Sequence, residues 1–205
     1  MNTKSLVNYL FEIANLGRVS RSGYYQFLYE DFDSVASHSY KVAVIAYLLA
    51  NSLDLDADKA VVIALFHDSQ ETRTGDSNWI QKPYLKQDEY KCFSDQIKFL
   101  GKNLLSKLVS LHKEYKQKNS KEAQVVSDAN YLDYYMSLRI LSMKGNREAD
   151  KRLEYETKNL DFMYTKLGKQ VLKEVLKADP NEWTRVSHKG TMKKYIKRAN
   201  RNKKL

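Results

Sequence analysis

Histidine and aspartate side chains occur inside apolar helical patterns at three places in this sequence. The apolar run AVVIALF, residues 60–66, leads directly into His67 and Asp68, while His38 and Asp128 lie on the apolar stripes of two other segments. Burying such a group without a partner costs on the order of several kcal/mol. The helical spacing of these groups therefore predicts that they share a buried partner.

One divalent cation would serve as that partner, because imidazole nitrogens and carboxylate oxygens are good ligands for first-row metals. We expect His38, His67, Asp68 and Asp128 to bind one ion per subunit, which could be Mn²⁺, Co²⁺, Ni²⁺, Mg²⁺ or Zn²⁺. A buried network of ion pairs is the alternative use of the same groups. Four protein ligands leave room on a six-coordinate ion for water, whose lowered pKa allows attack on phosphorus at neutral pH.

Helical periodicity runs through most of the chain and predicts the elements that position these groups. With two prolines, seven glycines and little strand-like alternation, the sequence indicates an all-α protein. Ser34 is a good N-cap for the helix that carries His38, and Asp56 or Asp58 begins the helix that leads to His67. The expected helices cover roughly residues 3–16, 34–52, 56–68, 87–100, 103–117, 120–143, 147–166 and 168–177.

Charge divides the chain into two parts. The net charge is +10, but residues 189–205 hold eight Lys or Arg and no acidic residue, so the rest of the chain carries only about +2. We expect one helical domain over residues 1–180 and a basic extension over 181–205. The tail over residues 189–205 lacks the set of aromatic platforms expected for base stacking, so the sequence predicts at most weak, nonspecific contact with nucleic acid.

The single cysteine, Cys92, cannot form an internal disulfide, which favours a reducing cytoplasm. The N-terminal segment carries an acidic residue and asparagines within its apolar stretch and does not resemble a signal peptide. The longest clean apolar stretch, residues 42–50, is far shorter than the ~20 residues that a membrane span needs. We therefore expect a cytoplasmic protein without a membrane segment.

The arrangement of His38, the pair His67–Asp68 and Asp128 resembles the H…HD…D pattern of the HD superfamily of metal-dependent phosphohydrolases. The surrounding blocks SVASHSYKVAVIAYLLA, ALFHDSQETRTGD and EAQVVSDANYLDYYM are similar to those of the family. LGRVSRSGYY resembles an N-terminal arginine motif of the branch that includes bacterial 5′-deoxynucleotidases. The resemblance implies an HD-domain helical bundle, and dimerisation is common in the family, so a homodimer is expected.

The resemblance also implies roles for three further residues. Glu71 lies one helical turn beyond His67 and would orient or deprotonate the attacking water, and Asp76 would assist protonation of the leaving oxygen or orient the nucleophile. The apolar residues of the arginine motif match Leu16 and Val19, which makes Arg21 the expected phosphate-binding residue. Without the motif, these three side chains would be interpreted as a helix-end carboxylate, a turn residue and a solvated arginine.

The resulting hypothesis is a metal-dependent 5′-nucleotidase that releases phosphate from (deoxy)nucleoside monophosphates. A close alternative is another HD phosphohydrolase activity, on a nucleoside triphosphate, a cyclic nucleotide or a guanosine polyphosphate. A nucleic-acid-binding protein with a purely structural metal belongs to a different class and stays open. His112 lies on an apolar stripe with Leu108, Leu111 and Tyr115, and is interpreted as structural or exposed rather than as a ligand to a second metal.

Overall fold

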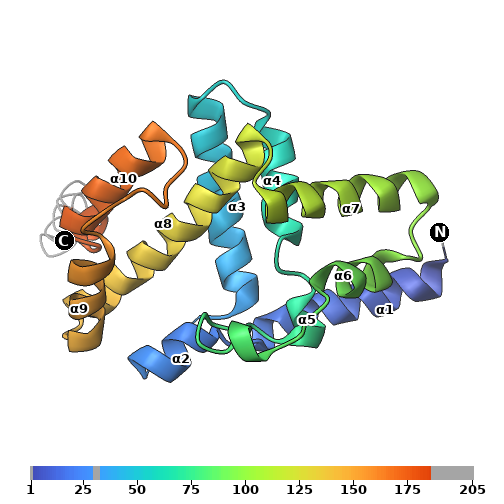
Figure 1. Ribbon diagram of the computed structural model, residues 1–205, viewed down its shortest axis with the longest axis horizontal. Helices are drawn as coiled ribbons and strands as arrows, with labels where there is room; N and C mark the ends of the chain where they lie inside the picture. Colours follow the sequence, from blue (N-terminus) through green and yellow to red (C-terminus); the bar gives the residue numbers. More distant parts are fainter. Residues whose placement is uncertain (1, 30–32, 186–205) are drawn as a thin grey trace, which may run out of the picture.

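The computed structural model describes residues 2–29 and 33–185, and this part of the chain is helical, as expected (Figure 1). Within these described residues, one β-bridge joins Ser20 to Ser34. The α-helices are α1 (Thr3–Ala14), α2 (Ser22–Leu28), α3 (Val35–Ser52), α4 (Ala57–Phe66), α5 (Glu71–Thr74), α6 (Glu89–Ile97), α7 (Lys102–Gln117), α8 (Lys121–Met143), α9 (Arg147–Glu156) and α10 (Lys166–Lys177). Two 3-10 turns, η1 (Asn15–Arg18) and η2 (Lys82–Tyr84), lie between them.

Side-chain caps determine where several of these helices begin. The Ser34 hydroxyl accepts a hydrogen bond from the Ser37 N–H at the start of α3, and Asp56 accepts one from the Lys59 N–H at the start of α4. Each bond satisfies a backbone donor that the first helical turn leaves unpaired. The helices that carry His38 and lead to His67 therefore start at the residues that the sequence predicts.

Helices α3, α4 and α8 form the centre of the molecule and pack against one another (Figure 1). Alanines in their contact faces let the backbones approach closely, since a methyl group fills little space. Fully buried alanines occur at positions 46, 50, 60, 64 and 129. His38 lies on α3 and His67 at the end of α4, so the close-packed core of these helices supports the candidate site.

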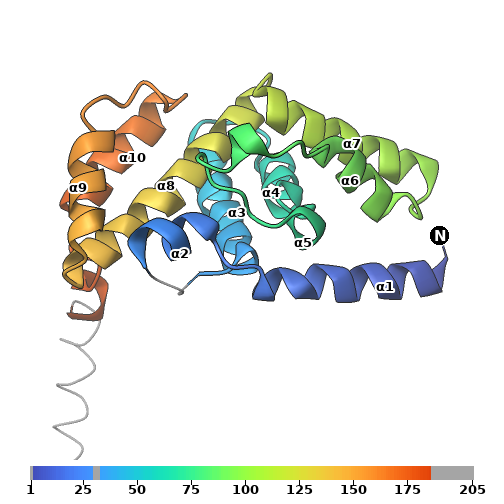
Figure 2. The ribbon, with the colours of Figure 1, turned by 60° about the horizontal axis from the view of Figure 1, so that its bottom comes forward.

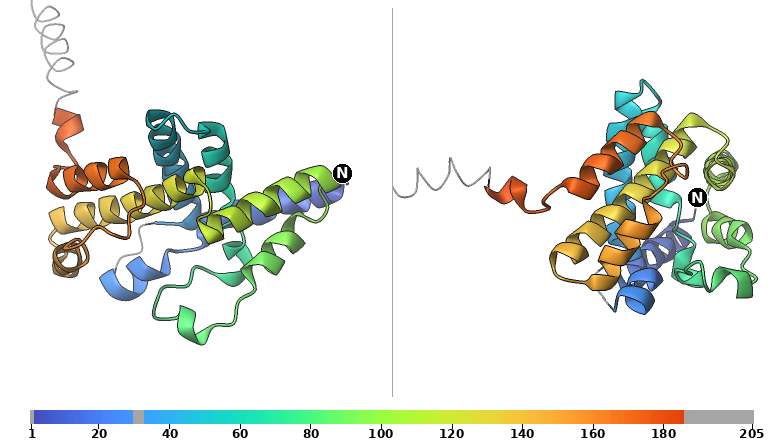
Figure 3. Two further views of the ribbon diagram at one scale, coloured as in Figure 1. Left: turned by 45° about the horizontal axis from the view of Figure 1, so that its top comes forward. Right: turned by 60° about the vertical axis from the view of Figure 1, so that its left-hand side comes forward.

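Two smaller groups of helices extend this centre. Helices α9 and α10 pack on α8, while α6 and α7 pack together at the opposite end of the molecule (Figures 2 and 3). The pair α6–α7 has a small core of its own, formed by Phe93, Ile97 and Leu108. Helix α8 therefore has neighbours on several sides and is buried along most of its length.

Two segments differ from the sequence prediction. Residues 22–28 form helix α2 within a stretch expected to be irregular, and α9 ends at Glu156 instead of continuing to residue 166. Residues 186–205, which include most of the basic extension, lie outside the described residues, so the division at residue 180 stays a prediction. Among the helices of the described part, none has the length and apolar character required to span a bilayer.

Candidate metal and phosphate site

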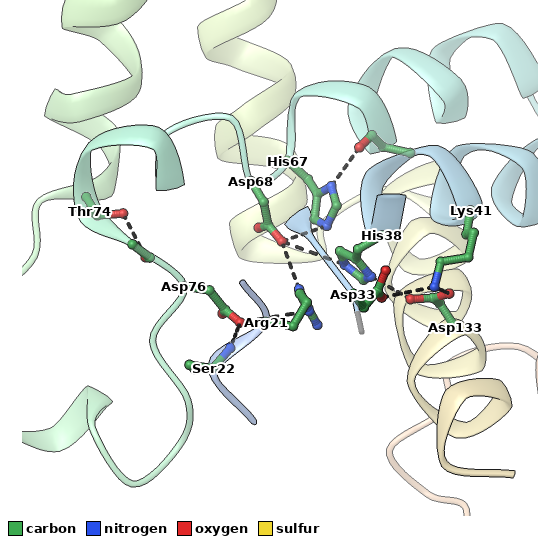
Figure 4. A network of polar contacts seen from close by, with 12 residues as sticks. Arg21, Ser22, Asp33, His38, Lys41, His67, Asp68, Thr74, Asp76 and Asp133 are labelled. Carbon is green, nitrogen blue, oxygen red and sulfur yellow. Dashed lines mark hydrogen bonds and ion pairs between the residues drawn. The ribbon is translucent and has the colours of Figure 1, made fainter. Parts of the chain in front are cut away.

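His38, His67 and Asp68 meet at the junction of α3 and α4. One ligand atom from each lies within 4.8 Å of the other two (Figure 4). His38 comes from the first turn of α3, and His67 caps the C-terminal end of α4. The helix ends after Phe66, so that His67 and Asp68, which would diverge by about 100° within a helix, both face His38.

Each of the two imidazole rings is oriented by a hydrogen bond from its own Nδ1 atom. Nδ1 of His67 donates to the carbonyl oxygen of Ala64 at 2.6 Å, and Nδ1 of His38 donates to Asp133 Oδ2 at 2.7 Å. The hydrogen is therefore on Nδ1 in each neutral ring, and Nε2 carries a lone pair. Both Nε2 atoms are buried without a hydrogen-bond donor, and both point to the same place (Figure 4).

The contact between His67 and Asp68 needs a positive charge. His67 Nε2 lies 3.0 Å from Asp68 Oδ2, and His38 Nε2 lies 3.8 Å from the same oxygen. Facing acceptor atoms at such distances repel each other unless a proton or a cation lies nearby. Two imidazole nitrogens and a carboxylate oxygen make a donor set that fits a divalent first-row metal, and the residues present are therefore suited to hold one.

Asp133 supports His38 from behind and was not anticipated from the sequence. Its carboxylate is almost fully buried, accepts from His38, and lies 2.9 Å from the Lys41 ammonium, which also contacts Asp33 at 3.0 Å. Burial opposes its ionisation, yet the His38 and Lys41 contacts lower the pKa of Asp133 below the usual value. A carboxylate behind a ligating histidine fixes the ring and increases its basicity.

The charge balance around the cluster keeps His38 neutral and Asp68 ionised. Burial, followed by the nearby Arg21 charge, lowers the pKa of His38 despite its bond to Asp133. Burial works against ionisation of Asp68, but a proton on the facing Nε2 of His67, whose place a cation would take, and the charge of Lys116 hold the pKa of Asp68 well below the usual value. Neutral imidazole and ionised carboxylate are the forms that bind a metal.

Arg21 links the cluster to Asp76. Its guanidinium lies 3.7 Å from Asp68 and 3.8 Å from Asp76, at the N-cap of α2 (Figure 4). Asp76 also accepts a 2.8 Å hydrogen bond from the backbone N–H of Ser22, the first residue of α2. Asp76 therefore ties the loop after α5 to the start of α2, and the structure brings the expected pair Arg21 and Asp76 to the cluster.

Glu71, at the start of α5, is close to the same charges. Burial, followed by the negative charges of Asp68 and Asp76, raises the pKa of Glu71 to about 10. Its Oε2 atom is buried and has no hydrogen-bond partner in the described structure. Such an orphaned carboxyl group has a free position for a proton or for a hydrogen bond to a bound molecule.

A cavity of about 500 Å³ opens beside Arg21 and Asp76. Aromatic rings form much of its wall, and Glu156 and the amide of Asn130 contribute polar groups. The aromatic lining residues are Tyr24, Trp79, Tyr131, Tyr134 and Tyr135. A volume of this size with apolar walls and a few polar groups is typical of sites for small organic ligands.

The structure does not bring Asp128 to the cluster, contrary to the sequence prediction. Its two carboxylate oxygens accept hydrogen bonds from the Tyr164 N–H at 2.7 Å and from the N–H and hydroxyl of Thr165 at 2.9 and 2.6 Å. Asp128 and Asp133 differ by five positions, which places their side chains about 140° apart around α8. Asp133 faces His38, and Asp128 therefore points to the loop before α10.

Asn130 is a second residue of α8 that the sequence analysis missed. It precedes Asp133 by three positions, and so lies on a similar side of the helix, where it lines the cavity with Arg21 and Asp76. The three-residue spacing of Asn130 and Asp133, which places both on one side of a helix, is the sequence signal that could have identified them. Helix α8 contacts helices on several sides, so apolar neighbours flank Asp128 and Asp133 alike and do not distinguish them.

His112 is buried, which agrees with its interpretation as structural. Its ring stacks on Phe93 with centroids 4.4 Å apart and planes 13° apart. Burial, helped by the charge of Lys116, lowers the pKa of His112 to about 4. The ring lies between α6 and α7 and is absent from the cluster of His38, His67 and Asp68.

Relatives of the chain were found by sequence and by structure. The 5′-deoxynucleotidase HDDC2 of Xenopus laevis is 28% identical over 169 residues, which cover 81% of this chain and 80% of that protein. Human 5′-deoxynucleotidase HDDC2 is 30% identical over 126 residues, 60% of this chain and 61% of that protein. A conserved hypothetical protein of Pyrococcus furiosus has a TM-score of 0.65 at 25% identity and covers 84% of this chain and 99% of its own.

A Pyrococcus horikoshii protein has a TM-score of 0.67 at 25% identity, covering 83% of this chain and 98% of its own. The model of the HD domain family matches residues 13–176, which include the three clustered residues, Arg21, Glu71 and Asp76. The match extends over most of the chain and includes part or all of each α-helix from α1 to α10 in the described structure. The chain therefore belongs to the HD-domain family.

Proposed function

We propose that the protein is a metal-dependent phosphohydrolase that releases inorganic phosphate from (deoxy)nucleoside 5′-monophosphates. The observation that carries the proposal is the pair of buried Nε2 lone pairs facing the Asp68 carboxylate beside a guanidinium. A divalent cation bound there would supply Lewis-acid chemistry, by withdrawing charge from a phosphate oxygen and by making water more acidic. The relatives named 5′-deoxynucleotidase support this choice of substrate class.

We assign separate roles in metal binding, phosphate binding and proton transfer to the residues of the site. His38, His67 and Asp68 would hold the cation, and the guanidinium of Arg21 would bind phosphate oxygens with two donors. Glu71 accepts a proton from the water nucleophile, because a positive charge brought into its negative surroundings lowers the pKa that burial and two carboxylates have raised. Asp76 pairs with Arg21, which supports the position of the guanidinium, and its proposed role is to assist protonation of the leaving oxygen or to orient the nucleophile.

The cavity accounts for the nucleoside part of the substrate. Arg21 and Asp76 lie at its wall, so a phosphate at the cluster would project its nucleoside among the tyrosines and Trp79. Aromatic rings bind a nucleobase by stacking, which is worth about 1–3 kcal/mol per base. This arrangement favours a small nucleotide over a bulky polymeric substrate.

A product assay tests the proposal. Metal-stripped protein is incubated with a panel of nucleoside mono- and triphosphates and cyclic nucleotides, with Mn²⁺, Co²⁺, Ni²⁺, Mg²⁺ or Zn²⁺ added back separately. Monophosphates should yield inorganic phosphate and a nucleoside. Release of pyrophosphate or tripolyphosphate from triphosphates, with monophosphates left intact, would instead assign another HD phosphohydrolase activity.

Variants at Glu71 and Arg21 separate the proposed roles. Glu71→Ala should lower kcat by about 10²–10⁴-fold, the usual contribution of general acid–base catalysis, while metal content stays unchanged. Arg21→Ala should raise KM because a charged contact to phosphate is lost. Loss of metal from Glu71→Ala would make Glu71 a ligand and contradict this division of roles.

A further inference from the structure

Lys118 occupies a backbone position that is unfavourable for lysine. It is the C-terminal cap of α7 and has φ 53° and ψ 32°, in the left-handed region. Its N–H bonds to Tyr115 O, and the following Asn119 N–H bonds to Glu114 O, which together make a Schellman motif. Glycine is the usual residue at this position, because it has no Cβ to clash with the backbone.

The Lys118 ammonium lies over a ring that itself packs on the candidate metal cluster. Its Nζ is 3.2 Å from the centre of the Tyr115 ring, and that ring lies edge-on to His67 with centroids 5.3 Å apart. The ammonium is therefore at most about 8.5 Å, the sum of these two distances, from the centre of the His67 ring. It approaches the cluster from α7, whereas Arg21 approaches from α2.

The ammonium of Lys118 also has no acidic partner among the described residues, although the side chain is half-buried. The neighbouring Lys116 differs, because its ammonium pairs with Glu89. Burial, together with the positive charge of Lys116, lowers the pKa of Lys118 to about 7. Lys82, a lining residue of the cavity, adds to the same positive field. A half-buried lysine in a strained backbone position, in contact with an aromatic ring but without an acidic partner among the described residues, is suited to an anion that arrives with a ligand.

We propose that Lys118 is a phosphate-binding residue of the candidate site, which contacts the phosphoryl group from the α7 side while Arg21 contacts it from the α2 side. The inference rests on the proposed function for the identity of the anion. It explains why lysine stands at a position that favours glycine: the side chain must reach the site from the end of α7. Two cations of different geometry would then bracket the group, a planar guanidinium and a compact ammonium.

Calorimetric titration of the Mn²⁺-loaded protein with inorganic phosphate tests this directly and needs no turnover. Lys118→Met removes the charge while keeping the chain length, and should weaken phosphate binding by about 10-fold or more, as expected for loss of a charged hydrogen bond. Lys118→Arg should restore most of the affinity. Lys113→Met is the matched control, because Lys113 is an exposed residue of α7 without an ion pair in the described structure, and it should bind phosphate normally.

Lys118→Gly separates binding from folding. Relief of the left-handed strain should raise the melting temperature by about 2–4 °C, while phosphate binding weakens as in Lys118→Met. Equal phosphate affinity in Lys118→Met and Lys113→Met would overturn the proposal, as would a wild-type protein that binds no phosphate. Failure of the proposed function appears separately, as normal phosphate binding without release of phosphate from any nucleotide.

Discussion

The carboxylate of Asp128 is surrounded by hydrogen-bond donors, whereas that of Asp68 faces two imidazole rings and a guanidinium. Substitution should therefore have different consequences at the two positions. Asp68→Ala should abolish binding of Mn²⁺, because it removes a ligand and leaves the two histidines alone. Asp128→Ala should retain the ion but melt at a lower temperature, because it leaves the buried donors of Tyr164 and Thr165 unpaired, at about 1–3 kcal/mol each.

Isothermal titration with Mn²⁺ and thermal melting in the presence of a chelator distinguish the two effects. The chelator removes the stabilisation that a bound ion adds by mass action. Loss of Mn²⁺ binding in a folded Asp128→Ala protein would return Asp128 to the ligand set and contradict its placement beside α10.

The sequence predicts the place of an individual residue in the site only where its pattern offers a single candidate of the right chemical type. The pair His67–Asp68 follows a buried run, and the structure places both residues in the cluster with His38, while Arg21 lies in a recognisable motif and its role stays a prediction. Asp133 was not, because two aspartates five positions apart on one central helix have similar apolar neighbours. Only the position of α3 beside α8 shows which carboxylate reaches His38.

At the scale of elements, α10 is attached to α8 through a tight contact at Gly168. A Cβ added to Gly168 would lie 2.4 Å from Asp128 Oδ2 and 2.9 Å from its Cγ, inside van der Waals contact. Gly168→Ala should therefore push the carboxylate away from Thr165 and destabilise the fold by about 1–3 kcal/mol, the usual cost of overpacking. Denaturant unfolding measures the change.

Gly17→Ala serves as the control, because a Cβ at Gly17 meets no atom within 4 Å. It should change the free energy of unfolding far less than Gly168→Ala does. Equal stability of the two variants would show that the Asp128 carboxylate can move without loss, and that its contacts do not hold α10 on α8.

Helix starts followed from the sequence better than helix ends did. Ser34, Asp56 and Ser120 cap α3, α4 and α8 at the predicted starts through local hydrogen bonds. Helix α10 instead begins at Lys166, after the N-cap Thr165, two residues before its predicted start at 168. The end of α9 was missed because Leu160, Phe162 and Met163 continue an apolar pattern beyond Glu156. These side chains pack against the core from an irregular segment, which leaves the Tyr164 and Thr165 N–H groups free to bind Asp128.

For the molecule as a whole, buried histidine makes stability depend on pH. In the unfolded chain a histidine titrates near pH 6.5, whereas the pKa of buried His112 is about 4. Between these values the unfolded state binds more protons, so stability falls as pH decreases. The contribution of neutral His112 is complete above pH 6.5 and is lost between pH 6.5 and 4, by an amount on the order of 3 kcal/mol.

His112→Phe should remove this dependence, because phenylalanine keeps a stacked ring on Phe93 without a titrating nitrogen. The measurement is the free energy of unfolding of metal-free protein from pH 7.5 to 4, for wild type and variant. His38 contributes in the same direction in both proteins, since its pKa is also lowered, so the difference between the two curves isolates His112. Parallel curves would show that the pKa of His112 is the same in the folded and unfolded states, and would contradict its burial as a neutral ring.

The polar contacts of the site join parts of the chain that are far apart in sequence. Ser22 and Asp76 are separated by 54 positions, and His38 and Asp133 by 95. During folding, such contacts form only after long loops close, which costs chain entropy that local helix formation does not recover. A refolding chain should therefore gain affinity for a cation late and in one step, together with its native core. The time course of cation binding during refolding would then report when the tertiary structure is complete.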